Sequence, residues 1–92
     1  IDEQGVFVEK LSLYPNPFQQ HFTLEFIFGE EVQHLIVEVY DVMGRPLVTR
    51  SEKQVTSGSI ELDLSCCAHG VYLCKITADG VILESRTLVH TK

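Results

Sequence analysis

Basic residues and long apolar runs are scarce in this sequence, and each shortage excludes a class of protein. The chain carries seven Lys and Arg against thirteen Asp and Glu, a formal net charge of −6. A protein that binds nucleic acid needs a concentrated basic surface to release counterions from phosphates, and the sequence has no such cluster. The apolar stretches, such as residues 26–28 and 35–37, are far shorter than the roughly 20 residues of a membrane-spanning helix. Neither a nucleic-acid partner nor a transmembrane segment is expected.

Cysteine is also sparse, with only Cys66, Cys67 and Cys74 in the sequence. Three cysteines are too few for a disulfide-stabilised scaffold, and the odd number leaves at least one thiol without an internal partner. Adjacent cysteines bridge each other only with strain. A bond from Cys66 or Cys67 to Cys74 is therefore the only plausible internal disulfide. The cysteines therefore do not identify the compartment.

The length of 92 residues fits a single domain with one thin core. Residues 2–5 are polar or permissive, and residues 1–5 are interpreted as the end of a linker from an upstream segment, which leaves residues 6–92 as the domain. Because the first residue is Ile1 rather than Met, we expect a piece of a longer protein, with any export signal upstream. Acidic residues are concentrated in residues 1–44, whose formal charge is −7, whereas residues 45–92 carry +1.

Apolar and polar residues alternate along most of the chain, and no stretch keeps the spacing of a helix. In residues 21–28, for example, every second residue is Phe or Leu. A strand with this pattern buries one face, and a slip of one residue would turn the whole apolar set toward water. The predicted core consists of the residues on the apolar side of these runs: Phe22, Leu24, Phe26, Leu35, Val37, Val39, Ile60, Leu62, Leu64, Tyr72, Cys74 and Ile76.

Turn-forming residues separate the alternating runs at intervals of roughly 8–12 residues. Asp79-Gly80 is a strong hairpin signal, because glycine accepts the positive φ of tight turns. The other turn signals are Pro15-Asn16-Pro17, Gly29-Glu30-Glu31, Met43-Gly44-Arg45-Pro46, Ser57-Gly58 and His69-Gly70. Since each strand buries one face, two sheets must stack, and the pattern predicts an all-β antiparallel sandwich of about seven strands.

Three groups of residues are candidates for chemistry, and none has the spacing that it needs. Cys66, Cys67, His69 and Cys74 offer metal ligands, but neighbouring cysteines do not form the spaced pairs of a zinc site. They also lack the converging base and orienting group of a cysteine nucleophile. Cys74 shares its strand face with Tyr72 and Ile76 and is therefore expected to be a buried thiol.

The remaining histidines and acidic residues have ordinary structural explanations. Three histidines are expected at solvent-facing strand positions or strand ends: His21, His34 and His90. The acidic residues do not form a calcium-binding loop and are interpreted as solvated turn or strand positions: Glu30, Glu31, Asp41, Asp63 and Asp79. No catalytic residue, cofactor or metal is expected.

Three punctuated motifs precede a final apolar strand. They are Leu13-Tyr14-Pro15-Asn16-Pro17, Val39-Tyr40-Asp41-Val42-Met43-Gly44-Arg45 and Gly70-Val71-Tyr72-Leu73. Two prolines make the first a stiff turn. Asp41 is positioned to cap backbone amides in the second, where Gly44 is free to take a positive φ. In the third, Gly70 allows a close approach or a bulge, and Tyr72 places its ring in the core.

In this order and spacing, the motifs resemble the C-terminal sorting domain of cargo proteins exported by the type IX secretion system of certain Gram-negative bacteria. The resemblance covers the chain from about Leu11 to Lys92. It implies an immunoglobulin-like β-sandwich that is a secretion signal and not an enzyme. The residues implied to be framework are Tyr14, Pro15, Asn16, Pro17, Tyr40, Asp41, Gly44, Arg45, Gly70 and Tyr72. The residues implied to carry the address are Arg86, Leu88, Val89 and Lys92.

The resemblance also implies partners and a location. The domain would be bound by the outer-membrane translocon after the cargo enters the periplasm. In most relatives a sortase-like cysteine peptidase then removes the domain while joining the cargo to a surface glycolipid, and some relatives keep the domain at the surface. The cargo would reach the outer-membrane surface or be secreted.

A second interpretation is a generic β-sandwich module that binds a carbohydrate or a protein partner. Exposed aromatic residues lining a groove would favour it, whereas the Phe residues here mostly occupy inward positions of the alternating runs. A third interpretation is a domain stabilised by a metal bound to the cysteines.

Overall fold

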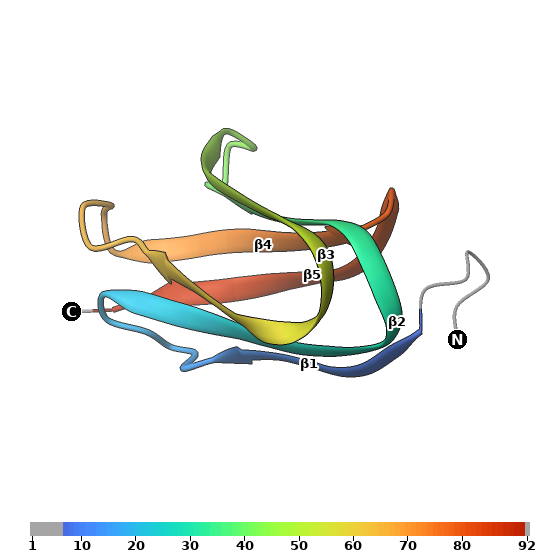
Figure 1. Ribbon diagram of the computed structural model, residues 1–92. Coiled ribbons are helices and arrows are strands. Elements are labelled where there is room, and N and C mark those ends of the chain that lie inside the picture. The colour runs from blue at the N-terminus through green and yellow to red at the C-terminus, as the bar shows by residue number, and fades with distance from the viewer. Residues whose placement is uncertain (1–6, 92) are drawn as a thin grey trace.

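The computed structural model describes residues 7–91, which form five strands and no helix (Figure 1). The strands are β1 (Val8–Tyr14), β2 (His21–Tyr40), β3 (Pro46–Asp63), β4 (Gly70–Ala78) and β5 (Val81–His90). The predicted all-β class is confirmed. No helix in the described part of the chain is long and apolar enough to cross a membrane. The predicted linker, residues 1–5, lies outside the described residues.

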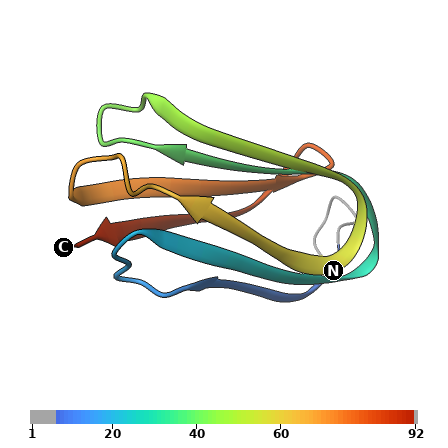
Figure 2. The ribbon, with the colours of Figure 1, turned by 60° about the vertical axis from the view of Figure 1, so that its left-hand side comes forward.

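All neighbouring strands pair antiparallel and form one curled sheet. β3 pairs with β2 along both halves of that strand. On its other edge, β2 pairs first with β1 and then, beyond the bend, with β4. β5 pairs with β4, so the order is β1-β2-β4-β5 with β3 on the far side of β2. β2 and β3 run side by side and turn together through the bend (Figure 2), which shapes the sheet as a half-barrel.

The strand count differs from the prediction because two of the expected turns lie inside strands. β2 continues through Gly29-Glu30-Glu31, and β3 continues through Ser57-Gly58. The β2–β3 register shifts between Ile27 and Val32, next to these residues. An irregularity of this kind bends a strand and increases its twist without ending it. The sequence thus predicted the positions of the bends correctly, but it assigned them to turns between about seven shorter strands.

The core fills the concave side of the curl, and every residue of the predicted core is buried. The structure adds further buried residues to this set: Leu13, Phe18, Phe28, Val32, Ala78 and Leu88. Burial of an aliphatic or aromatic side chain of this size contributes about 1.5–3 kcal/mol. The alternation of apolar and polar residues along the strands is therefore the pattern that stabilises the fold.

The segments that carry the three motifs gather toward one end of the molecule. The β1–β2 connection, the β3–β4 connection and the end of β5 lie on the left in Figure 1, whereas the β4–β5 turn lies on the right. The β2–β3 turn, which carries the second motif, projects from the top of the same view and lies at the same end as the β3–β4 connection in Figure 2. This arrangement brings the terminal strand together with residues from the beginning of the chain.

Candidate functional site

β5 is the last strand of the sheet and contains three of the four residues proposed to carry the address. It pairs with β4 from Val81, opposite Ala78, to His90, opposite Gly70. Strand alternation places Leu88 in the core with 0% of its surface exposed, while the neighbouring Val89 is 37% exposed. Lys92 lies outside the described residues. The strand thus presents Val89 outward and uses Leu88 as an anchor.

Arg86 lies on the same row as Leu88, facing the concave side, and is half-buried. Its Nη2 is 3.1 Å from Glu84 Oε2, also on this row. Charged side chains that point inward on an edge strand discourage uncontrolled pairing with another chain. Arg86 is opposite Cys74 in the register. Burial raises the pKa of the Cys74 thiol to about 12, and the positive charge of Arg86 offsets this only in part.

The first motif covers the free edge of the end of β5. Asn16 donates from Nδ2 to the Thr87 carbonyl and accepts at Oδ1 from the Val89 N–H, both at 3.0 Å. A side-chain amide carries the same donor and acceptor as a peptide unit, so Asn16 substitutes for a neighbouring strand. The Phe18 N–H then donates to the Val89 carbonyl at 2.9 Å, and the Thr91 N–H donates to the Phe18 carbonyl at 2.8 Å. We call these four hydrogen bonds the Asn16 clamp.

Aromatic packing holds the clamp against the core. Phe18 is buried, and its ring centroid lies 5.2 Å from that of Phe22 and 4.8 Å from that of His90. His90 Nε2 lies 2.9 Å from the Leu64 carbonyl oxygen, which ties the end of β5 to the β3–β4 connection. His90 ends β5, one of the positions expected for the histidines, and only 3% of its surface is exposed. Its alternation with Leu88 places it on the inner row.

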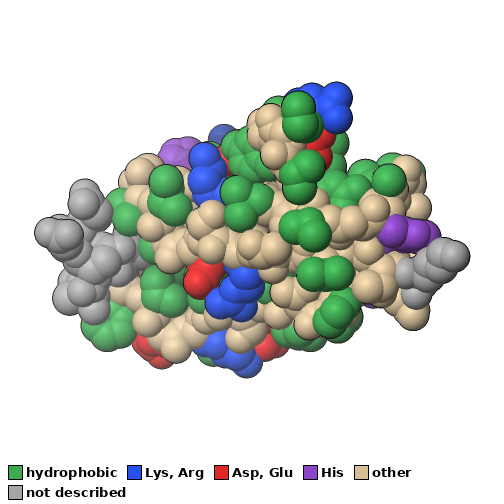
Figure 3. Space-filling view, turned by 180° about the vertical axis from the view of Figure 1, so that it is seen from behind, with side chains coloured by type: hydrophobic (Ala, Val, Ile, Leu, Met, Phe, Trp, Pro, Cys, Tyr) green, Lys and Arg blue, Asp and Glu red, His purple; other side chains and the backbone are tan. Residues whose placement is uncertain are grey.

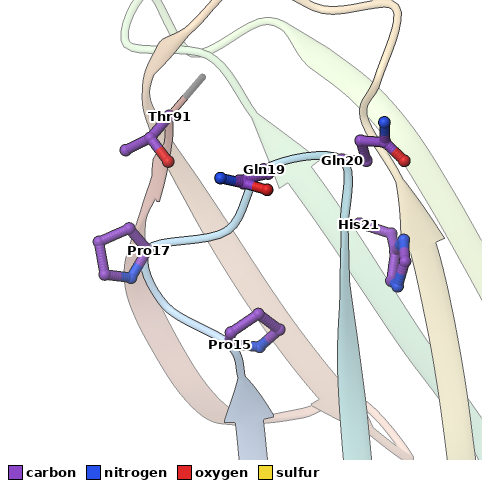
Figure 4. A pocket seen from close by; sticks show the side chains of 6 residues that line it. All are labelled: Pro15, Pro17, Gln19, Gln20, His21 and Thr91. Atoms are coloured by element: carbon purple, nitrogen blue, oxygen red, sulfur yellow. The ribbon is translucent and has the colours of Figure 1, made fainter.

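A shallow pocket of about 400 Å³ lies beside the clamp. Figure 4 shows Pro15, Pro17 and Thr91 on one side of this hollow and Gln20 and His21 on the other. His21 Nε2 is also 3.5 Å from Glu61 Oε2 on β3. The two motif prolines therefore form a wall next to the end of the terminal strand.

The second motif forms a rigid turn around the Asp41 carboxylate. The N–H groups of Met43 and Arg45 donate to Oδ1 at 2.9 and 3.0 Å, and Arg45 Nε donates to Oδ2 at 2.7 Å. The Gly44 N–H donates to the Asp41 carbonyl at 3.0 Å, and Gly44 has a φ of +85°. The Arg45 amide, followed by its side chain and the Met43 amide, holds the Asp41 pKa below its usual value. We call this structure the Asp41 turn.

The third motif joins β4 to the connection before it. The Tyr72 ring is buried, as predicted, and its hydroxyl donates to the Ala68 carbonyl. Burial raises the pKa of Tyr72. Gly70 has a φ of +150°, and a Cβ on it would meet no atom within 4 Å. The backbone angle, and not the expected close approach, therefore accounts for glycine at this position.

The cysteines are free thiols: Cys66 is exposed, Cys67 is half-buried and Cys74 is buried. The predicted burial of Cys74 is confirmed. Burial, together with the neighbouring Cys66 thiol, raises the pKa of Cys67. Within residues 7–91, no group of three or more His, Cys, Asp or Glu side chains could hold a metal ion.

The fold and the three motifs define a small all-β module whose terminal strand is hydrogen-bonded to the β1–β2 connection. Residues 12–90 match the family described as secretion system C-terminal sorting domain. The chain belongs to this family, the C-terminal sorting domains of the type IX secretion system. It is a secretion signal domain of a non-catalytic family, which confirms the predicted function and the expectation that it is not an enzyme. Membership implies a cargo that is secreted or held at the cell surface, and an interaction with the secretion machinery.

A solved structure supports the fold independently. The chain is similar to part of the crystal structure of dimeric latent PorU from Porphyromonas gingivalis, with a TM-score of 0.70 and 21% sequence identity. The similarity covers 88% of this chain and 9% of that chain. No curated protein matches this chain.

Sequence reasoning grouped the motif residues as framework but missed what Asn16 contacts. The residues that Asn16 bonds are 71 and 73 positions away, and no local pattern records so distant a pairing. The burial of His90 did have a signal, because His90 continues the alternation that begins at Leu88.

Proposed function

We propose that the end of the chain carries the address that the outer-membrane translocon reads. The residues assigned to it are Arg86, Leu88, Val89 and Lys92. The observation that carries the proposal is the position of β5 at the sheet edge, with Val89 exposed and its backbone edge covered by the Asn16 clamp rather than by a further strand. An edge strand offers backbone groups to which a receptor strand can add. Leu88 fixes the strand and becomes accessible only if the strand is displaced.

The pathway that follows is part of the same proposal. The cargo enters the periplasm, the translocon binds this domain, and a sortase-like cysteine peptidase removes it while joining the cargo to a surface glycolipid at the outer membrane. The domain is the substrate of these steps. Membership in the sorting-domain family supports this sequence of events.

We also infer that the two halves of the curled sheet correspond to the two layers of an immunoglobulin-like sandwich. β2 and β3 each contribute a segment to either side of the bend. Counting those segments separately gives about seven, as in such sandwiches. The carbohydrate-binding alternative has less support, because four of the five Phe side chains are buried: Phe18, Phe22, Phe26 and Phe28.

The test is export of the complete cargo protein with Arg86→Gln and Lys92→Gln in this domain. Thermal stability should stay nearly unchanged, since the Arg86–Glu84 pair is partly open to solvent and such pairs contribute about 0–1 kcal/mol, while export should fall. Lys10→Gln with Lys53→Gln removes the same charge away from β5 and serves as the matched control. Normal export of the first variant would contradict the proposal. Truncation after Leu88 is a poorer test, because it also removes the buried His90 and the clamped Val89 amide.

A further inference from the structure

The Asp41 turn holds two large apolar side chains in water. Val42 and Met43 are 76% and 77% exposed, although the turn that carries them is fixed by the hydrogen bonds to Asp41. Single exposed apolar residues are normal on a protein surface. Two neighbouring ones on a turn whose backbone is held in place are already oriented for contact, so a partner would lose little conformational entropy by binding them.

Further exposed apolar residues lie next to this turn. Leu73 of β4 is opposite Tyr40 at the end of β2, and Val71 is opposite Val89 of β5. One shallow pocket, of about 440 Å³, lies between Val42 and Leu73, and a second, of about 300 Å³, joins Met43 to Val71. We call the exposed set Val42, Met43, Val71, Leu73 and Val89 the apolar platform. Figure 3, the view from behind, shows hydrophobic side chains on the projecting turn and across the face beneath it.

The rim of the platform is close to electrically neutral. Arg45 is paired with Asp41 at 2.7 Å. Lys75 lies 3.7 Å from Glu38 and 5.4 Å from the centre of the Tyr40 ring. With Arg45 and Lys75 paired, the described part of the rim has no surplus positive charge to attract an anionic lipid surface, whose binding depends on clustered Lys and Arg. The platform therefore suits a partner whose own contact surface is apolar and weakly charged.

The size of the platform indicates the kind of complex that it forms. The platform consists of five side chains, three of which are less than half exposed, and exposed apolar patches on monomers reach roughly 300–600 Å². A stable dimer buries about 800 Å² on each partner, so a lasting pair of two copies of this chain is not favoured. A short-lived contact with another protein fits, because a signal that is read and then released needs a weak interface.

We propose that the apolar platform docks a protein subunit of the secretion machinery, which binds it alongside the terminal strand. The inference rests on the proposed function, since Val89 belongs both to the platform and to the proposed address. It adds a second recognition element, carried by the Asp41 turn and β4 and separate from the charges of Arg86 and Lys92.

The test uses the complete cargo protein with Val42→Ser and Met43→Ser. Ile82→Ser is the matched control, because Ile82 is 61% exposed on β5 but lies near the β4–β5 turn, at the opposite end. Export should fall roughly tenfold in the double variant, the effect of losing about 1.4 kcal/mol of binding, and stay unchanged in the control. Thermal melting should be the same for all three proteins. A photoreactive amino acid at position 43, but not at position 82, should crosslink to an identified subunit of the type IX machinery.

The alternative outcomes are distinct. Normal export of the platform variant, with loss of export by Arg86→Gln and Lys92→Gln, would overturn this inference and leave the proposed function standing. Normal export of both variants would overturn both. Crosslinking at position 43 only to a second copy of the chain would overturn it in favour of self-association. Binding to vesicles of phosphatidylethanolamine and phosphatidylglycerol that is lost in the platform variant, without a crosslink to the machinery, would overturn it in favour of a lipid surface. If the double variant melts at a lower temperature, the crosslink at position 43 decides.

Discussion

The Asn16 clamp and the Asp41 turn both centre on a short polar side chain, yet they connect very different parts of the chain. Asn16 bonds to Thr87 and Val89, which are 71 and 73 residues away. Asp41 bonds within a span of four residues. The first therefore closes the sheet, and the second shapes one turn. The two motifs thus have separate tasks. The Asn16 clamp holds the terminal strand, and the Asp41 turn presents a surface.

The largest effect is expected at Leu88, which tests whether the core or the clamp holds β5. Leu88→Ala deletes fully buried atoms and should lower the free energy of unfolding by about 2–5 kcal/mol, as measured by urea denaturation. Ile82→Ala on the same strand should change it by about 0.5 kcal/mol or less, since Ile82 is exposed. Equal effects of the two substitutions would show that packing does not anchor the strand.

Asn16→Ala should have the next largest effect. It removes two hydrogen bonds to β5, and because each contributes about 0.5–1.5 kcal/mol, the free energy of unfolding should fall by roughly 1–3 kcal/mol. Asn16→Asp keeps the acceptor for the Val89 N–H but places a carboxylate oxygen against the Thr87 carbonyl, so it should not restore stability at neutral pH. Hydrogen exchange of the Val89 amide measures the local effect. Unchanged exchange in both variants would mean that the clamp does not hold the strand.

Thiol labelling of Cys74 separates the clamp from the Asp41 turn. Cys74 is buried opposite Arg86 of β5, and its pKa of about 12 keeps the thiol protonated at neutral pH. We expect slow labelling of Cys74 and rapid labelling of the exposed Cys66. Asn16→Ala should accelerate Cys74 labelling by about tenfold for each 1.4 kcal/mol lost, while Asp41→Ala should leave the rate nearly unchanged. Equal acceleration by both variants would remove the proposed distinction.

The smallest effect is the response of the Asp41 turn to acid. Its carboxyl has a lowered pKa in the folded chain, so its stabilising effect is present above the unfolded pKa of about 3.9 and is lost as the pH falls through the folded pKa. The protection of the Met43 and Arg45 amides against hydrogen exchange should therefore fall below about pH 4. The Val89 amide should respond less, because the clamp contains no ionisable group, and Asp41→Asn should abolish the dependence at the turn. A stronger response at Val89 than at Met43 would contradict this assignment.

The fold was predictable from sequence where local alternation decides it. Side chains such as Leu24, Val37 and Ile76 are buried because the strand period of two places them on one face, and a reader of the sequence can count that period. The bends at Gly29-Glu30-Glu31 and Ser57-Gly58 were located but misassigned. Glycine and polar residues accompany both a turn and an irregularity within a strand, and only the pairing partners distinguish the two.

The candidate site was less predictable because its contacts are long-range. The resemblance grouped Asn16 with the framework residues, but nothing near Asn16 in the sequence indicates Thr87 or Val89 as its partners. The apolar platform has the same origin, since it joins the turn after β2 to faces of β4 and β5. Val42 and Met43 are exposed because they lie in the turn, and Val71, Leu73 and Val89 because they lie on the outward rows of their strands.

The length of chain that separates the two halves of the Asn16 clamp also bears on the order of folding. Contacts between residues far apart in sequence require the closure of a long loop, and sheets built on such contacts fold slowly, in milliseconds to seconds. The clamp joins the β1–β2 connection to the last strand, so we expect it to close only after the intervening strands are in place. A partly folded chain therefore does not display Val89 in its final setting. A receptor that recognises this setting selects domains that have completed folding.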